Sequence, residues 1–346
     1  MQPLKSIAWA RGFIVLVMAP VHTLLLYGNP DAHNSWLGKT FAFIAEGPGA
    51  PLLMVLMGLL FALSGKHTAG SVLKRSALLL LAACTLNCIK FVLPAALGWM
   101  PEGLTEDLQI SPGIKGLMQL FLLGDVLHFA ALAFPLLYIV HKHSQHKNLP
   151  LVLVLIVCIV APVCWLLAEK YSANYLLVLA GGHPPQVFFP LFPWLAYPLF
   201  GMFLGQQIKN KDWVMETLLV PGCLLILAGL TIERFLHYRD PFDFYRPLPG
   251  ALLKHIGIVC ITLFVWDRLA CYLQTNAFFR ILEYLSKHIT AAYIIQWIII
   301  CWMLPLFGYE KLDLYQSILA IIFTTSLTGG FLLSYTYLIN RYEKNL

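Results

Sequence analysis

Residues 9–27 read WARGFIVLVMAPVHTLLLY, an apolar stretch long enough to cross a lipid bilayer as a helix. Two ionisable side chains, Arg11 and His22, lie within it. A separation of eleven positions is about three full helical turns, so the two side chains share one face, roughly 16 Å apart along the axis. Because a charge is costly in lipid, this face is expected to meet a bundle interior or a wet cavity. The pair is therefore the first candidate for a functional site.

The composition extends the membrane interpretation to the whole chain. Of the 346 residues, 59% are hydrophobic and only 12% are charged, and the mean hydropathy is +0.75. These values lie far outside the range of soluble globular domains. We predict an all-α, polytopic membrane bundle of about ten spans, at residues 7–27, 41–64, 76–97, 117–140, 151–168, 187–206, 218–235, 252–272, 289–306 and 315–338.

Positive charges predict the orientation of this bundle. The connections on the N-terminal side carry 14 of the 23 lysines and arginines, against eight on the opposite side. Because loops rich in Lys and Arg stay in the cytoplasm, both termini are expected there. The longest polar connections, residues 98–115, 169–186 and 236–251, are too short for a separate core, so we predict one membrane domain over residues 1–346.

Two of the predicted spans contain helix-breaking residues. Residues 46–51 read EGPGAP, which places Glu46 beside two prolines and two glycines. Broken backbone at membrane depth is tolerated only where protein buries it or a cavity lies alongside. Pro190, Pro193 and Pro198 interrupt the start of the sixth span, which we expect to be kinked.

Other ionisable side chains lie within apolar spans. Lys90, in the third span, is expected either to contact an anionic substrate or to pair inside the bundle. Asp125 and His128 are three positions apart in the fourth span and so share one helix face. They form either a catalytic or substrate-binding pair or a structural polar pair.

One connection on the non-cytoplasmic side mixes arginines, acids and aromatic rings. Residues 233–250 read ERFLHYRDPFDFYRPLPG and include Arg239 and Arg246. Rings that stack and guanidinium groups that bind oxygens suit the recognition of sugars or anions. The alternative is a solvated interfacial loop with an aromatic belt. The histidines of residues 141–147 have metal-like spacing, but we interpret them as a solvated cytoplasmic turn and predict no metal site.

Three motifs together resemble a known superfamily. Arg11 and His22 give the pattern R-x10-H, which is similar to the signature of the integral-membrane acyltransferase 3 family. Residues 189–205, FPLFPWLAYPLFGMFLG, resemble the FPLxPWLxYxxxGxxxG segment of heparan-α-glucosaminide N-acetyltransferase-like proteins. Residues 282–297, LEYLSKHITAAYIIQW, resemble a segment near the end of both groups. The motifs occur in the family's order with a similar span count, so the resemblance covers most of the chain.

The chain departs from the family pattern at two positions and adds a competing histidine. Ala8 stands where an acidic residue is common, and Gln296 stands where His is usual. These differences leave an atypical or inactive member open. Residues 33–38, HNSWLG, resemble the loop that carries the catalytic histidine in the heparan-type enzymes, so His33 competes with His22.

The resemblance implies an acyltransferase that moves an acetyl group from cytoplasmic acetyl-CoA to a hydroxyl or amine of a saccharide or envelope glycan across the membrane. Expected partners are the acetyl-CoA donor, the glycan acceptor and the lipid bilayer, with no nucleic acid. The expected location is the cytoplasmic membrane of a bacterium. A homo-oligomer is left open, as are the acceptor's identity, the acyl length and the choice between direct transfer and an acyl-histidine intermediate.

Such a reaction needs a base for the acceptor proton, donors for the tetrahedral oxyanion and cations for the CoA phosphates. Histidine suits the role of base because its pKa is ordinarily near neutrality. The alternatives left open are a structural histidine at position 22 and, at position 11, an arginine that only snorkels to lipid phosphate. The candidate residues are His22, His33 and Glu46 for catalysis, Arg11, Lys90, Asp125 and His128 for the donor, and Trp36, Arg239 and Arg246 for the acceptor.

Two other functions compete with this interpretation. A transporter or flippase of an anionic or sugar-linked substrate would use broken helices and intramembrane charges equally well. Such a protein should often show corresponding breaks in its two halves, whereas the break at residues 46–51 has no convincing counterpart in the seventh span. A non-catalytic family member is the second alternative, suggested by Ala8 and Gln296.

Overall fold

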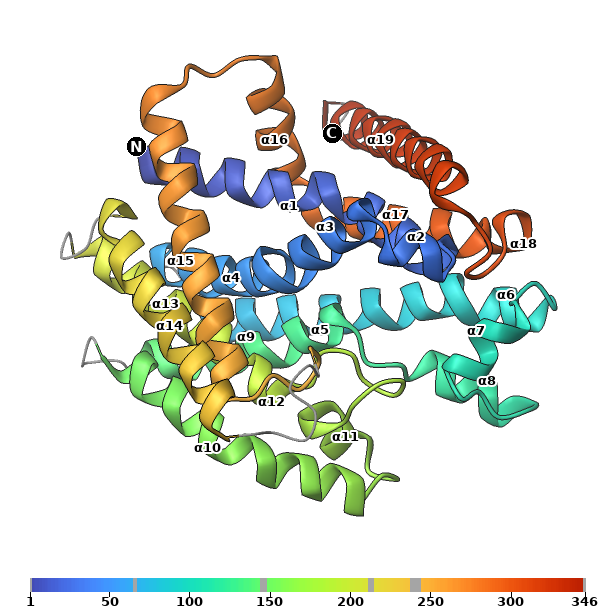
Figure 1. The fold of residues 1–346 in the computed structure, drawn as a ribbon, viewed down its shortest axis with the longest axis horizontal. Helices are drawn as coiled ribbons and strands as arrows, with labels where there is room; N and C mark the ends of the chain where they lie inside the picture. The colour runs from blue at the N-terminus through green and yellow to red at the C-terminus, as the bar shows by residue number, and fades with distance from the viewer. Residues whose placement is uncertain (1, 65–66, 144–147, 211–214, 237–243, 345–346) are drawn as a thin grey trace. The chain divides into compact units, whose positions relative to one another are not determined.

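The computed structural model describes residues 2–64, 67–143, 148–210, 215–236 and 244–344. Within these segments all regular secondary structure is helical, apart from two isolated bridges that join Gly28 to Leu312 and Gly124 to Val187. Figure 1 shows the helices coloured along the chain. The prediction of an all-α protein is confirmed.

The long helices are apolar enough for a membrane. In the described part of the chain, seven helices can cross a bilayer by length and composition, and an eighth is added if a pair bent by 86°, Ala277–Lys287 with Ile289–Trp302, counts as one span. These helices fit a multi-pass membrane protein. The total of ten spans and the cytoplasmic termini stay predictions. The seven are Lys5–Tyr27, Trp36–Ser64, Ala69–Ala96, Val126–His143, Leu149–Lys170, Pro249–Tyr272 and Leu314–Tyr342.

The chain divides into two compact units, each assembled from segments that are distant in sequence. The first unit comprises Met1–Ile7, Glu46–Thr85 and Leu122–Tyr272. The second unit comprises Ala8–Ala45, Leu86–Phe121 and Leu273–Leu346. The prediction of one domain over residues 1–346 stays a prediction.

The first unit contains most of the central helices. Short helices and a π-helical turn, η1, connect the longer ones. Its elements are η1 (Ala45–Gly49), α4 (Ala50–Ser64), α5 (Ala69–Asn87), α9 (Val126–His143), α10 (Leu149–Lys170), α11 (Tyr175–Gly181), α12 (Leu191–Trp194), α13 (Ala196–Lys209), η3 (Met215–Thr217), α14 (Leu219–Leu236) and α15 (Pro249–Tyr272).

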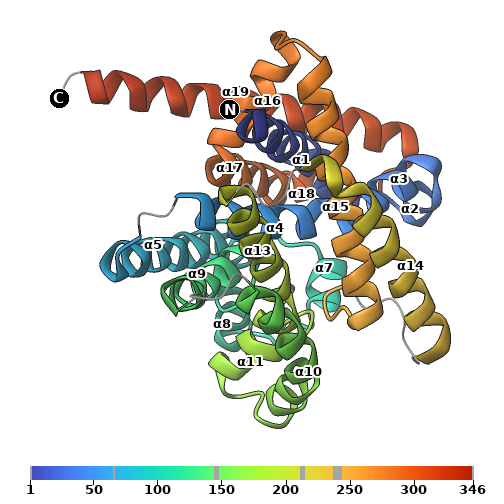
Figure 2. The same ribbon diagram turned by 90° about the vertical axis from the view of Figure 1, so that its left-hand side faces the viewer.

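Glycines bring two pairs of helices in this unit into close contact. A side chain at Gly58 of α4 would collide with the carbonyl oxygen of Pro198, and one at Gly201 of α13 would collide with that of Val55. In the same way Gly222 of α14 faces α15, and Figure 2 shows these two helices side by side. Small residues that let backbones approach are the usual means of packing helices in membranes.

The second unit joins the first helix to the C-terminal third of the chain. Its elements are α1 (Gln2–Tyr27), α2 (Pro30–Asn34), α3 (Trp36–Ile44), the π-helical η2 (Cys88–Val92), α6 (Leu93–Ala96), α7 (Glu102–Asp107), α8 (Ile114–Phe121), α16 (Ala277–Lys287), α17 (Ile289–Trp302), α18 (Leu304–Phe307) and α19 (Leu314–Lys344).

The predicted interruptions of the second and sixth spans are confirmed. The π-helical turn Ala45–Gly49 lies between α3 and α4, where Pro48 and the two glycines disturb the regular bonding. In the sixth span, Phe192 has non-helical backbone angles inside α12, and the longer helix α13 follows from Ala196. That span therefore enters through a kinked segment.

The fourth span differs from its prediction. Residues 117–140 were expected to form one helix, but α8 ends at Phe121 and α9 begins at Val126. The reason is that the backbone groups of Gly124 form hydrogen bonds with a distant segment. Its N–H donates to the Gln186 carbonyl at 2.8 Å, and its carbonyl accepts from Phe188 N at 2.9 Å. A helix cannot continue through a residue whose hydrogen bonds are so used.

Candidate functional site

The first helix and the late motif lie against each other in the second unit. Arg11 donates from Nε to the Ser286 hydroxyl at 2.8 Å and from a terminal nitrogen to the Ser286 carbonyl at 2.5 Å. The next residue, Gly12, lies so close to Leu282 that a Cβ there would collide with the Leu282 carbonyl. On the same helix, Trp9 donates to Glu283 at 3.0 Å. The R-x10-H motif and residues 282–297 therefore meet, although they lie at opposite ends of the chain.

His22 lies against the end of the same late motif. Its Nδ1 atom is 3.2 Å from Nε2 of Gln296, a fully buried residue. Its ring lies 4.4 Å from that of Trp297, centroid to centroid. Neither partner was singled out as a binding residue from the sequence alone, although Gln296 was noted as a departure from the family pattern. The two contacts fix the imidazole within the interior of the unit.

A third ionisable residue of the second unit, Lys90, lies close to Trp297 of the same late motif. It lies in the π-helical turn Cys88–Val92 and is only 2% exposed. Its ammonium group lies 4.7 Å from the ring of Phe91 and 4.6 Å from that of Trp297. Rings stabilise a cation through the negative charge of their faces, and more strongly when water is excluded. Trp297 thus contacts both His22 and Lys90, and the two are brought into one neighbourhood.

This neighbourhood can support proton transfer next to a fixed positive charge. Either the nitrogen or the oxygen of the Gln296 amide can face Nδ1 of His22. The nitrogen would place the imidazole proton on Nε2, and the oxygen would place it on Nδ1. If the amide oxygen accepts from Nδ1–H, the lone pair lies on Nε2, which is then the atom that can act as a base. Lys90 supplies the charge that an anionic substrate or a developing oxyanion would need.

The other histidine of the family comparison lies in a different local setting. His33 is half-buried at the end of α2, where Ser35 caps the next helix by accepting from Gly38 N at 3.2 Å. Within the described ranges its side chain makes no hydrogen bond. Trp36, at the start of α3, is 69% exposed. Trp36 is therefore exposed, whereas His33 and His22 are both half-buried.

Glu46 lies in the first unit and is exposed on the π-helical turn Ala45–Gly49. The pairing of Glu46 with a histidine or with Arg11 that we considered is not seen among the described residues, where Glu46 makes no ion pair. It interacts electrostatically with Lys254, whose ammonium group is itself paired with Glu233 at 2.8 Å.

Asp125 and His128 lie at the start of α9 rather than along its face. The carboxylate of Asp125 accepts from Val126 N at 2.7 Å, and the Asp125 N–H donates to Nδ1 of His128 at 3.2 Å. Both residues are buried. These bonds satisfy backbone groups that a helix start leaves without partners. The two alternatives for this pair, a substrate-binding role and a structural role, both stay predictions.

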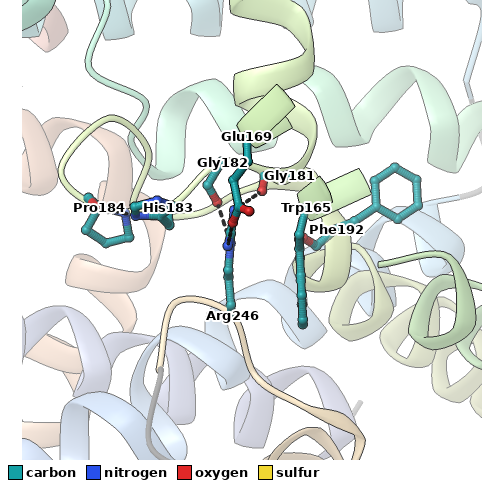
Figure 3. Close-up of polar contacts among 8 residues, drawn as sticks. All are labelled: Trp165, Glu169, Gly181, Gly182, His183, Pro184, Phe192 and Arg246. Atoms are coloured by element: carbon teal, nitrogen blue, oxygen red, sulfur yellow. Dashed lines mark hydrogen bonds and ion pairs between the residues drawn. The ribbon is translucent and has the colours of Figure 1, made fainter. Parts of the chain in front are cut away.

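Arg246 joins the ends of two helices in the first unit, as Figure 3 shows. It donates to Glu169 at 2.8 Å, to the Gly181 carbonyl at 2.6 Å and to the Gly182 carbonyl at 3.2 Å. Its guanidinium also lies 5.5 Å from the ring of Trp165. Arg246 therefore ties its own loop to the C-terminal ends of α10 and α11. Arg239, the other arginine predicted in this loop, lies outside the described residues.

A polar pair that was not selected from the sequence lies between α13 and α15. The hydroxyl of Tyr197 is 2.8 Å from Nδ1 of His255, and both residues are buried. Aromatic rings surround the pair, including Phe244, at 6.2 Å from His255, and Trp194, at 5.1 Å from Tyr197. Two signals were available: Tyr197 belongs to the FPLxPWLxY motif, and His255 is an ionisable residue within an apolar span.

Within the described residues no group of three His, Cys, Asp or Glu side chains is placed to hold a metal ion. None of the eight cysteines, all of which lie in the described ranges, forms a disulfide.

Comparison with known proteins supports the family suggested by the first two motifs. The model of the family described as heparan-α-glucosaminide N-acetyltransferase, catalytic, matches residues 4–221. Comparisons with curated proteins and with solved structures each give no match. The match covers more than half of the chain and includes both the R-x10-H motif and the FPLxPWLxY segment. The chain belongs to the family of heparan-α-glucosaminide N-acetyltransferase catalytic domains.

Proposed function

We propose that this protein is a membrane-bound acetyltransferase that moves an acetyl group from cytoplasmic acetyl-CoA to a hydroxyl or amine of a saccharide or envelope glycan on the opposite side. The observation that supports this proposal most directly is the contact of His22 with Gln296 and Trp297, in a chain whose family has this type of activity. The cytoplasmic membrane of a bacterium is the proposed location.

In this proposal His22 removes the proton from the acceptor as its oxygen or nitrogen attacks the thioester carbonyl of acetyl-CoA. A tetrahedral intermediate forms, the carbon–sulfur bond breaks, and the CoA thiolate leaves and takes up the proton held by the imidazole. Gln296 orients the imidazole, and Lys90 stabilises the negative charge on the intermediate. A direct transfer of this kind needs fewer steps than an acyl-histidine intermediate.

The remaining candidates have proposed roles that follow from their positions. His33 and the exposed Trp36 would receive the acceptor, with His33 as the alternative base. Arg11 would attract the anionic donor at its end of α1. Glu46 is kept as a candidate for positioning the acceptor, and Asp125, His128 and Arg246 would hold helix starts and loops of the first unit.

The experiment that tests this proposal is acetyl transfer by the purified protein in lipid nanodiscs. Radiolabelled acetyl-CoA is supplied with a panel of amino sugars and envelope saccharides, and products are identified by mass spectrometry. Labelled acetyl on a saccharide is the expected result. Folded protein that neither binds CoA nor labels any acceptor would disprove the proposal. It would then leave the transporter and the non-catalytic member as the remaining interpretations.

A further inference from the structure

The second polar pair, Tyr197 and His255, has a fixed arrangement of protons. Tyr197 is fully buried, and within the described residues its hydroxyl has one hydrogen-bond partner, Nδ1 of His255, at 2.8 Å. If the hydroxyl only accepted from Nδ1–H, its own proton would be left unsatisfied in a buried place, which is costly. The hydroxyl therefore donates to Nδ1. A neutral imidazole carries one proton, so that proton lies on Nε2 of His255.

The Nε2–H group is thus a donor whose partner is not supplied by the described chain. His255 is 8% exposed, so an edge of its ring can be reached from outside. The nearby rings of Phe244 and Tyr245 are also partly exposed, and they lie 5.2 Å apart, centroid to centroid. A few directed polar groups among aromatic rings are typical of a small-molecule site.

The charges beside this pair favour a neutral ligand over an anion. The adjacent cation, Lys254, is held by both oxygens of Glu233, at 2.8 and 3.0 Å. Its charge is therefore balanced by a carboxylate of the protein. A neutral N–H donor next to apolar ring faces suits a hydroxyl or ring oxygen and the C–H face of a sugar.

We propose that Tyr197 and His255 form a saccharide-binding site in the first unit, in which His255 Nε2–H donates to an oxygen of the sugar. Tyr197 is the positioning residue that fixes the tautomer, and Phe244 with Tyr245 forms the apolar floor. The choice of a sugar as the ligand rests on the proposed function, in which the protein acts on a saccharide.

Two substitutions of His255 distinguish the loss of its Nε2–H donor from a change in packing. His255→Asn keeps an oxygen near the position of Nδ1, which can still accept from Tyr197, but it removes the Nε2 donor. His255→Gln reaches further and returns an N–H donor near the position of Nε2. His143→Asn, at an exposed histidine near the end of α9, is the matched control. Thermal unfolding in nanodiscs checks that all three variants fold.

Binding is measured directly, by saturation-transfer NMR with methyl α-D-glucosaminide as the probe and without acetyl-CoA. We expect saturable binding to the wild-type protein and to His143→Asn, about tenfold weaker binding to His255→Asn, and recovery of most of the affinity in His255→Gln. Three results would each overturn the site: no saturable signal on the wild-type protein, unchanged binding by His255→Asn, or equal weakening in both His255 variants.

The same measurement keeps this inference distinct from the proposed function. If the probe binds as expected but no acetyl is transferred to any acceptor, the saccharide site stands and the acetyltransferase proposal fails. If transfer succeeds while His255→Asn binds the probe normally, the enzyme stands and this site is wrong.

Discussion

Gln296 places its side-chain nitrogen 3.2 Å from Nδ1 of His22, joining residues that are 274 positions apart. Two further hydrogen-bonded pairs join the same segments, Trp9 with Glu283 and Arg11 with Ser286. The late motif therefore positions the first helix along much of its length. The resemblance of residues 282–297 to the family motif leads us to expect His at position 296, and here an amide makes the contact. A partner of this kind orients an imidazole and selects its tautomer.

We expect Gln296 to support acetyl transfer through its hydrogen bond to His22. Gln296→Leu keeps the volume but removes the partner of Nδ1, so we expect kcat for acetyl transfer to fall at least tenfold, with a stability loss of about 1 kcal/mol. Gln296→His should retain activity because a ring nitrogen can replace the amide. Initial rates and thermal unfolding measure the two effects, and full activity of Gln296→Leu would contradict the proposed orientation.

Substituting His22 and His33 one at a time tests which of the two is the base. We expect His22→Ala to lower kcat by about 10²–10⁴, the usual contribution of a general base. His33→Ala should raise the KM of the acceptor more than it lowers kcat, because His33 is proposed to receive the acceptor together with the exposed Trp36. His143→Ala serves as the control at an exposed site. The reverse pattern, with kcat lost in His33→Ala alone, would assign the base to His33.

Arg11 is expected to act both on α16 and on the donor. Arg11→Lys cannot reach both Ser286 atoms in one geometry, so we expect a stability loss of about 1 kcal/mol with a KM for acetyl-CoA raised only a few-fold, because the charge remains. Arg11→Met should raise that KM at least tenfold. Equal KM values in the two variants would show that Arg11 serves only to hold Ser286.

Arg246 is expected to stabilise the loop that contains it. Arg246→Met removes donors to Glu169, Gly181 and Gly182 and leaves two carbonyl groups without this partner, so we expect a stability loss of about 2–3 kcal/mol in thermal unfolding. Glu169→Gln should cost less than 1 kcal/mol because Glu169 is largely exposed and the carbonyl contacts survive. Arg234→Met, at an exposed arginine of α14, is the control. Similar melting of all three variants would contradict this role.

The packing of α4 against α13 predicts a sharp contrast between glycines. Gly58→Ala places a methyl group against the backbone of Pro198, so the helices must separate and we expect a loss of at least about 2 kcal/mol. Gly330→Ala, in α19, meets no atom within 4 Å and should stabilise its helix by up to about 1 kcal/mol. Thermal unfolding of both variants in the same lipid decides the matter. Equal effects would mean that the close contact of α4 with α13 is not essential.

Local features of the fold were predictable because their causes are local. Apolar runs of suitable length gave the long helices, and the prolines and glycines of residues 46–51 gave the π-helical turn Ala45–Gly49. The fourth span failed for a non-local reason. Gly124 is bonded to residues 186 and 188, about sixty positions away, and nothing in the apolar pattern of residues 117–140 indicates that pairing.

The candidate site shows the same division. Arg11, His22 and Lys90 could be selected from the sequence because an ionisable side chain in an apolar span is costly and therefore informative. Trp297 and Ser286 could not, since Trp and Ser at a helix interior are ordinary. His255 escaped selection even though it obeys the rule that identified His22, and its significance became visible only beside Tyr197.

The sequence by itself determined that this chain is helical, apolar and a member of an acetyltransferase family, because helix formation, membrane affinity and motif order are properties of the linear chain. Only the tertiary structure decided that Gln296 and Trp297 surround His22, that Arg246 binds Glu169, and that Tyr197 sets the tautomer of His255. These pairings join distant residues through hydrogen bonds that act over about 3 Å, so they exist only once the helices have packed.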